Sequence, residues 1–280
     1  MQAMDPVTIG DVTFGKGHPL ALVAGPCVVE SREIQVGTAK ELQKICKRLG
    51  LGLIFKSSFE KDNRGSEKNY RGPGREEGID ILRAVKGETG LPILTDIHRE
   101  QDVDDCMDVV DVLQIPAYLC QQTSLLLTAA ESGKAINVKK GQFLAPENMS
   151  SALGKIRSKG NRRVLLTERG SCFGYNRLVS DMRCIPIMRD LGAPVLMDAT
   201  HIIRIYGVPS NDPKGGEREF VPTLVFAGVA AGCDGLFIES HPRVQEALCD
   251  SVSQWPLDKL EKLLSDALAF AQLARSRGLV

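Results

Sequence analysis

Cationic side chains are concentrated in the segment 56–74, which reads KSSFEKDNRGSEKNYRGPG. Its candidates for anion binding are Lys56, Lys61, Arg64, Lys68 and Arg71, with Ser57, Ser58, Asn63 and Ser66 between them. Glycines and Pro73 keep the segment from continuing as a strand or a helix. Arginine can hold phosphate or carboxylate oxygens with two hydrogen bonds, and lysine acts as a point charge. The segment therefore suits a phosphorylated or carboxylated ligand, and the alternative is a solvated loop balanced by its own acidic residues.

Two later cations extend this cluster, because each follows or ends an apolar run. The full candidate set is Lys56, Lys61, Arg64, Lys139 and Arg169. Burying several like charges in one pocket is costly unless an anion compensates them. The expected ligand is therefore multiply negative, as a phosphorylated acid and a phosphorylated sugar together would be. No glycine-rich nucleotide motif follows a predicted strand, so a nucleotide is not expected.

A second constellation could bind a metal ion. It consists of Cys27, His201, Glu239 and Asp250. Thiolate, imidazole and carboxylate ligands suit Zn²⁺, Fe²⁺, Mn²⁺ or Co²⁺. The residues lie far apart in the chain, so their spacing forms no motif. The residues alone leave the alternative open that Cys27 is a buried core thiol and His201 a core histidine.

A third candidate is the segment 204–218, RIYGVPSNDPKGGER, which is rich in turn-forming residues. It is either a mobile lid that excludes water during a reaction or a long surface loop. Two histidines, His98 and His241, stand just past predicted strand ends. Each is a candidate for lining a pocket or for a role in the core.

The elements that must position these residues follow a regular alternation. Short apolar, β-branched runs predict strands at Leu20–Ala24, Leu53–Lys56, Ile93–Asp96, Val112–Ile115, Ala135–Lys139, Val164–Thr167, Val195–Asp198 and Leu236–Glu239. Helical patterns occupy 31–49, 75–88, 100–107, 123–132, 147–159, 179–191, 219–231 and 257–277. This alternation predicts an α/β fold, a (β/α)₈ TIM barrel forming one domain over residues 1–280. A doubly wound open sheet is the alternative.

A short hairpin is predicted before the barrel, within residues 1–15. Its strands are Val7–Ile9 and Val12–Phe14, joined by Gly10 and Asp11. In a barrel of this kind the chemistry lies at the carboxyl ends of the strands. Those ends carry a polar or ligating side chain in every case: Cys27, Lys56, Asp96, Gln114, Lys139, Arg169, His201 and Glu239. Singly, each could be a satisfied polar terminus, but their convergence on one face favours a site.

The composition narrows the class of protein. The chain has 280 residues, 25% of them charged, with a formal net charge of zero, so bulk charge favours neither nucleic-acid nor membrane binding. No apolar run reaches the roughly 20 residues of a membrane span, and the first residues lack a signal-peptide pattern, so a cytoplasmic location is expected. The 8 cysteines contain no C-x-x-C pair, which predicts reduced, buried thiols.

Motifs along residues 20–260 identify a family. LVAGPCVVES, KSSFEKDNRGSEKNYRGPG, LTDIH, LQIPAYL, VKKGQF, TERGSCFGYN, MDATH, GCDGLFIESHP and ALCDSVSQWPL together resemble the 3-deoxy-D-manno-octulosonate 8-phosphate synthases, also called 2-dehydro-3-deoxyphosphooctonate aldolases. The resemblance implies a barrel homotetramer that condenses phosphoenolpyruvate with arabinose 5-phosphate and water and releases phosphate. The product would feed lipopolysaccharide precursor biosynthesis.

The resemblance also implies roles for single residues. Phosphoenolpyruvate would be held by Lys56, Lys61, Lys139 and Arg169, beside Asp96, Gln114 and the backbone of Ala117, and the sugar phosphate by Asn63, Arg64 and Ser66. Lys56, Lys61, Lys139, His201 and Asp250 would act in catalysis. Metal-independent members have Asn in place of Cys27, so the set Cys27, His201, Glu239 and Asp250 matches the metal-dependent class.

Four positions depart from the family pattern: Asp62, Gly65, Gly141 and Arg177 stand where Ala, Ser or Thr, Pro and Asn are usual. The charge of Asp62 lies beside the expected sugar-phosphate residues and bears on sugar preference. The closest alternative is a 3-deoxy-D-arabino-heptulosonate 7-phosphate synthase, which uses erythrose 4-phosphate and has a K-P-R-T-S segment in place of KDNRGS. Sialic acid synthases are more distant, and a non-catalytic sugar-phosphate-binding regulator would be expected to lose some strand-end residues.

Overall fold

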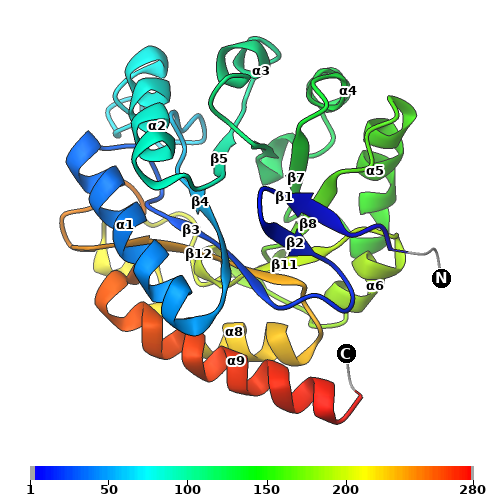
Figure 1. The fold of residues 1–280 in the computed structure, drawn as a ribbon. Coiled ribbons are helices and arrows are strands. Elements are labelled where there is room, and N and C mark those ends of the chain that lie inside the picture. The colour runs from blue at the N-terminus through cyan, green and yellow to red at the C-terminus, as the bar shows by residue number, and fades with distance from the viewer. Residues whose placement is uncertain (1–3, 279–280) are drawn as a thin grey trace.

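Apolar runs form a closed parallel barrel in the computed structural model, which describes residues 4–278 (Figure 1). The sheet order is β11-β8-β7-β6-β5-β4-β3-β12-β13, and an additional pairing of β11 with β12 closes the barrel. The barrel strands are β3 Ala21–Gly25, β4 Gly52–Lys56, β5 Ile93–Asp96, β6 Val112–Ile115, β7 Ala135–Lys139, β8 Val164–Glu168, β11 Val195–Asp198 and β12 Gly235–His241. The two-residue β13, Trp255–Pro256, adds to the carboxyl end of β12. The predicted barrel is confirmed, and the open-sheet alternative is excluded by the β11–β12 pairing.

Helices surround the barrel on the outside, and local signals set their ends. The Ser31 side chain accepts a hydrogen bond from Ile34 N at the start of α1, and Gly50, with a φ of 66°, ends that helix. The helices are α1 Arg32–Leu49, α2 Arg75–Thr89, α3 Gln101–Cys106, α4 Thr123–Glu131, α5 Met149–Ser158, α6 Cys184–Asp190, α7 Ala199–Ile202, α8 Val221–Ala230 and α9 Leu260–Ser276. Within residues 4–278, no helix has both the length and the apolar character needed to cross a membrane.

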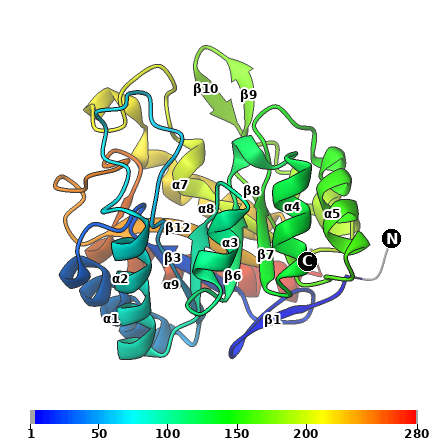
Figure 2. The same cartoon turned by 90° about the horizontal axis from the view of Figure 1, so that it is seen from above.

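The predicted amino-terminal hairpin is also confirmed. Strands β1 Val7–Ile9 and β2 Val12–Phe14 pair in antiparallel fashion, and all the apolar side chains of this pair are buried. They join the inward-facing side chains near the amino ends of the barrel strands: Ala21, Val23, Ile54, Leu94, Val112, Ala135, Leu165, Leu196 and Phe237. Figure 2 shows the hairpin at the opposite end of the barrel from β9 and β10. The hairpin therefore fills the amino end of the barrel.

One predicted helix, 179–191, is wrong at its start. The helix α6 begins only at Cys184, because Val179 ends a second hairpin, β9 Ser171–Gly174 and β10 Arg177–Val179, and residues 180–183 connect the two. This hairpin projects from the carboxyl end (Figure 2). Tyr175 and Asn176 connect its strands with φ values of 55° and 57°. Positive φ at both central residues is the geometry of a type I′ hairpin turn. The helical prediction failed here because no residue of 179–183 is buried, so this stretch lacks the buried apolar face of a helix packed on the barrel.

We expect the amino-terminal hairpin to contribute strongly to stability. Phe14 is fully buried, and its ring lies against Gly235, where an added Cβ would come within 2.9 Å of it. Phe14→Ala should therefore lower the free energy of unfolding by about 3–5 kcal/mol, because it leaves a cavity in the barrel interior. Urea unfolding measures this, with Phe143→Ala, at a side chain that is 59% exposed, as the matched control. Equal effects of the two substitutions would contradict a packing role for the hairpin.

Candidate active site

A close approach of two strands begins the site at the carboxyl end of the barrel. Gly25 ends β3 with a φ of 155°, and a Cβ there would lie 2.1 Å from the carbonyl oxygen of Lys56. Only glycine fits this approach without moving the backbone. The approach lets Lys56 Nζ, at the end of β4, donate to the Cys27 carbonyl oxygen at 2.8 Å. Two of the predicted strand-end residues are thereby held together.

The three buried lysines of the predicted cation cluster each face a buried carboxylate. The pairs are Lys56 with Glu239, Lys61 Nζ with Asp96 Oδ2 at 3.0 Å, and Lys139 Nζ with Asp198 Oδ2 at 2.6 Å. Lys139 also lies over the Phe237 ring, with its Nζ 3.9 Å from the ring centre. These contacts offset part of the cost of burying positive charge. The predicted cation cluster therefore exists, and it is built as ion pairs.

The cations keep the buried carboxylates ionised. Burial alone would raise the pKa of Glu239, but the charges of Lys56 and His201 bring it well below its usual value. Burial likewise raises the pKa of Asp96, but the charge of Lys61 helps to lower it by more, so the pKa lies well below its usual value. Burial lowers the pKa of Lys139 despite its pairing with carboxylates. The floor of the site is therefore a dense array of fixed charges of both signs.

Arg169 is the cation of this cluster without an acidic partner. It follows β8, is 5% exposed, and forms no ion pair with any residue in the range 4–278. Its Nη1 donates to the Tyr206 hydroxyl at 3.1 Å, and that oxygen also accepts from Gln142 Nε2 at 2.9 Å. A buried guanidinium held only by a neutral hydroxyl is ready to bind an anion.

Two adjoining cavities open above these charges. They share Asn63, Arg169 and His201 in their walls. The inner cavity, of about 60 Å³, is also lined by Lys61, Asp96, His98, Ala117 and Lys139. The outer cavity, of about 480 Å³, is also lined by Arg64, Ser66, Arg204, Tyr206 and Asp250. The inner space is therefore strongly charged, and the outer one has room for a larger polar molecule.

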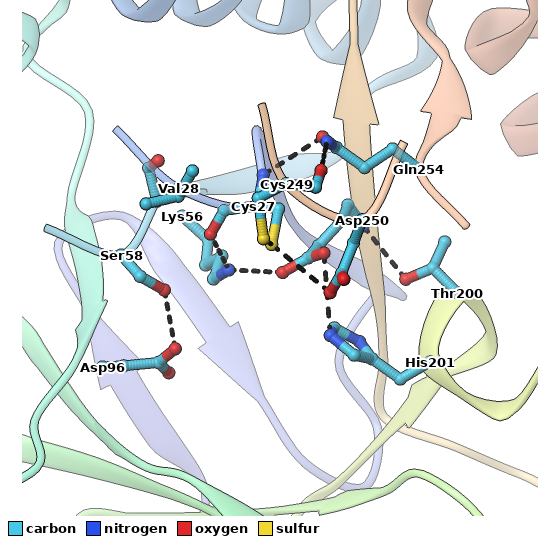
Figure 3. A network of polar contacts seen from close by, with 12 residues as sticks. Cys27, Val28, Lys56, Ser58, Asp96, Thr200, His201, Cys249, Asp250 and Gln254 are labelled. Atoms are coloured by element: carbon cyan, nitrogen blue, oxygen red, sulfur yellow. Dashed lines mark hydrogen bonds and ion pairs between the residues drawn. The ribbon is translucent and has the colours of Figure 1, made fainter. Parts of the chain in front are cut away.

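The candidate metal ligands lie close together, and Figure 3 shows Cys27, His201 and Asp250 among them. His201 and Asp250 also line the outer cavity. Ligand atoms of His201, Glu239 and Asp250 lie within 4.8 Å of one another, and so do those of Cys27, Cys249 and Asp250. Asp250 belongs to both groups, and Cys27 Sγ lies 3.6 Å from its Oδ2. The structure thus brings together all four residues of the predicted metal set.

The donor atoms fit a divalent cation. Glu239 is fully buried, and its Oε2 has no hydrogen-bond partner in the described part of the chain. His201 Nδ1 lies 2.7 Å from Asp198 Oδ2, while its Nε2 lies 3.6 Å from the unpartnered Glu239 oxygen. A proton on Nδ1 directed at Asp198 would leave the lone pair of Nε2 for a metal ion. An unpaired carboxylate oxygen opposite an oriented imidazole is what a cation site requires.

Some predicted residues lie beside the cavities rather than in their walls. Lys56 is 1% exposed and contacts Glu239 from below, and Gln114 donates to Asp96 and accepts from Asn137 Nδ2 at 2.7 Å. Ala117 lines the inner cavity, and Ser66 is an exposed residue on the rim of the outer one. Of the two candidate histidines past strand ends, His98 and His241, the first lines the inner cavity.

His241 is buried, with Nε2 3.4 Å from Glu30 Oε2, and lines neither cavity. The prediction that all cysteines are buried is wrong at Cys172, which is exposed on β9. The remaining cysteines are buried, as predicted.

The predicted lid segment 204–218 forms part of the outer wall. Tyr206 N donates to the Asn176 carbonyl oxygen at 2.8 Å, and Arg177 pairs with Glu217 at 2.7 Å. These contacts join the segment to the turn and second strand of the β9–β10 hairpin. Arg177, one of the departures from the family pattern, thus takes part in this junction.

Sequence reasoning missed three functional residues, and each had a weak signal. Asp198 is the last residue of a correctly predicted strand, but His201, three residues later, was predicted as the functional residue there. Tyr206 lies inside the segment that was treated only as a lid. Cys249 directly precedes Asp250, so its place in the chain indicated a position beside the metal ligands.

Comparisons with known proteins show the family of the chain. A family model described as the DAHP synthetase I family matches residues 3–273. A 2-dehydro-3-deoxyphosphooctonate aldolase from Syntrophotalea carbinolica is 50% identical over 271 residues, covering 97% of this chain and 98% of that protein. Proteins of the same name from Geobacter sp. (strain M21) and Xanthomonas campestris pv. campestris are 52% and 47% identical, covering 92% and 96% of this chain and 94% and 97% of their own.

Proposed function

The chain belongs to the DAHP synthetase I family, and we propose that it condenses phosphoenolpyruvate with D-arabinose 5-phosphate and water. The products are 3-deoxy-D-manno-octulosonate 8-phosphate and phosphate, in lipopolysaccharide precursor biosynthesis. The observation that carries this proposal is the pair of adjoining cavities, one with several buried cations and one with Asn63 and Arg64 at its wall. The printed names of its relatives, at about half identity over nearly the whole chain, support the same activity.

The inner cavity would take phosphoenolpyruvate. Lys61, Lys139 and Arg169 supply positive charge around this space. Arg169 would bind an anionic group with its free guanidinium, while the ion pairs of the lysines keep them in place. Fixed charges of this kind stabilise developing negative charge without reorganisation during the reaction.

The outer cavity would take the sugar phosphate. Asn63 and Arg64 would bind its phosphate, and its aldehyde would then face the inner ligand across the wall that both cavities share. The alternative acceptor, erythrose 4-phosphate, is disfavoured by the KDNRGS sequence, which replaces the K-P-R-T-S segment of those synthases. Asp62 pairs with Arg71 rather than with Arg64, so its charge is taken up outside the proposed phosphate position.

The reaction joins the two ligands in three bond changes. The enol carbon of phosphoenolpyruvate attacks the aldehyde carbon, and the aldehyde oxygen takes a proton to become a hydroxyl. Water adds at C2 of the former phosphoenolpyruvate and gives up a proton, for which Asp250, a carboxylate on the outer wall, would be the acceptor. The C–O bond to phosphate then breaks as the new hydroxyl at C2 gives its proton to the departing phosphate, leaving the keto acid. Holding both ligands in contact supplies much of the rate acceleration.

We propose that Cys27, His201, Glu239 and Asp250 hold one divalent cation, Mn²⁺, Fe²⁺, Zn²⁺ or Co²⁺. When bound, the cation would supply positive charge for orienting a carbonyl oxygen or activating water. Glu239 contacts both this group and Lys56, and Asp198 contacts both His201 and Lys139. The same carboxylates would thus orient the metal ligands and the substrate-binding lysines.

We also propose a homotetramer in the cytoplasm. Phe173 and Tyr175 are 78% and 93% exposed on the β9–β10 hairpin, and exposed aromatic residues of this kind are typical of subunit interfaces. A cytoplasmic location suits two charged substrates that do not cross a lipid bilayer unaided. Sedimentation equilibrium measures the number of subunits.

The substrate proposal predicts a defined pattern of turnover. Phosphoenolpyruvate consumption should occur with arabinose 5-phosphate and be much slower with erythrose 4-phosphate. Chelator treatment should abolish it, and added Mn²⁺ should restore it, because the four ligands hold a required cation. Preference for erythrose 4-phosphate would overturn the assigned acceptor. Full turnover after thorough chelation would overturn the metal and leave the condensation reaction in place.

The orientation of His201 predicts an effect on metal binding. Asp198→Asn should weaken divalent metal affinity by about 10–100-fold, because the neutral amide holds the imidazole less firmly. Competition against a coloured chelator measures the affinity. Asp190→Asn, an exposed site at the end of α6, is the matched control. An affinity unchanged by Asp198→Asn would show that this carboxylate does not position the ligand.

A further inference from the structure

A second cysteine, Cys249, lies at the proposed metal site. Its Sγ is 2.9 Å from Cys27 Sγ, and both residues are buried. This distance is longer than a covalent S–S bond of about 2.05 Å, so the two sulfurs are separate thiols. We propose that Cys249 is a second sulfur ligand of the divalent cation, beside Cys27. The inference rests on the metal site of the proposed function and extends it by one ligand.

The position of Asp250 places both sulfurs within reach of one ion. Ligand atoms of Cys27, Cys249 and Asp250 lie within 4.8 Å of one another, and Asp250 has the same relation to His201 and Glu239. An ion beside the Asp250 carboxylate therefore faces both groups. Glu239 Oε2, a buried carboxylate oxygen without a hydrogen-bond partner in the described part of the chain, is independently available as a ligand in this space.

A buried glutamine holds the two cysteines together although they are far apart in sequence. Gln254 Oε1 accepts from Cys27 N at 3.1 Å, and its Nε2 donates to the Cys249 carbonyl oxygen at 2.8 Å. Gln254 is fully buried, so this clamp is protected from competing water. The pairing of the sulfurs is therefore built into the backbone contacts of the site.

Backbone strain next to Cys249 also points to a function. Asp250 has a φ of 48°, a left-handed conformation that is uncommon for residues other than glycine. Such conformations persist where the surrounding structure imposes them, and they cluster at ligand sites. Here the turn brings Cys249 and Asp250, which are consecutive, to the same small space.

A cationic side chain fixes the direction of the Cys249 sulfur. Arg64 Nη1 donates to Cys249 Sγ at 2.9 Å and lies 3.7 Å from Asp250 Oδ1. Arg64 is the residue proposed to bind the sugar phosphate, so the second sulfur lies between the metal group and the outer cavity. Two sulfur ligands would favour thiophilic ions such as Zn²⁺, Co²⁺ and Fe²⁺ over Mn²⁺ or Mg²⁺.

X-ray absorption spectroscopy of the unmodified, zinc-loaded protein tests the ligand count directly. We expect two sulfur atoms in the first coordination shell, at about 2.3 Å from zinc. A shell with a single sulfur would overturn the proposal, and so would zinc bound only by nitrogen and oxygen. This measurement needs no substituted protein and no turnover.

A cobalt-loaded variant gives a second readout. In Cys249→Ser the sulfur-to-cobalt charge-transfer absorption should fall to about half of its original intensity, because one of two sulfur ligands is lost. Cys106→Ser, at a buried thiol on α3 outside the metal group, is the matched control and should keep the full absorption. Full absorption in Cys249→Ser, with all of it lost in Cys27→Ser, would assign one sulfur ligand and overturn the inference.

The two proposals fail in different ways. A zinc shell with two sulfurs, in a protein that does not condense phosphoenolpyruvate with either sugar, would overturn the proposed reaction and retain Cys249 as a ligand. Normal condensation by a protein whose zinc has a one-sulfur shell would retain the proposed reaction and overturn Cys249 as a ligand.

Discussion

Compensation of buried charge is the constraint on which the carboxyl end of this barrel depends. Lys56 and Lys139 at strand ends and Lys61 in the loop after β4 would destabilise the fold if they were buried alone. Each is paired with an aspartate or glutamate from another strand. Two of these carboxylates, Glu239 and Asp198, also contact His201. The lysine cluster and the metal group are therefore one electrostatic unit, in which a change at either part alters the other.

The barrel strands and the loops form different parts of the site. The inner cavity is lined mainly by residues at or just past strand ends, such as Asp96, Lys139 and Arg169. The outer cavity is formed largely by the loop after β4 and by residues 204–210. The most highly charged part of the site is thus held by the sheet, whose hydrogen bonds fix it. The part that selects the second ligand lies on loops, where substitutions such as those at Asp62 and Gly65 are tolerated by the fold.

Much of this arrangement could be predicted from sequence, because buried parallel strands are continuous apolar runs and their last residues share one face. This placed Cys27, Lys139, Arg169 and Glu239 correctly at one end of the barrel. Sequence could not say which way a strand-end side chain points, so Lys56 and Gln114 were expected in the cavity walls and instead lie beneath them. The β9–β10 hairpin was missed because its exposed strands lack an apolar run.

The amino-terminal hairpin separates the two ends of the barrel by role. Strands β1 and β2 pack against the inward-facing side chains near the amino ends of the barrel strands, and none of their residues lines either cavity. Both cavities are lined by residues at the opposite, carboxyl end. A ligand therefore reaches the charged groups only from the carboxyl end, and the amino end is left to packing.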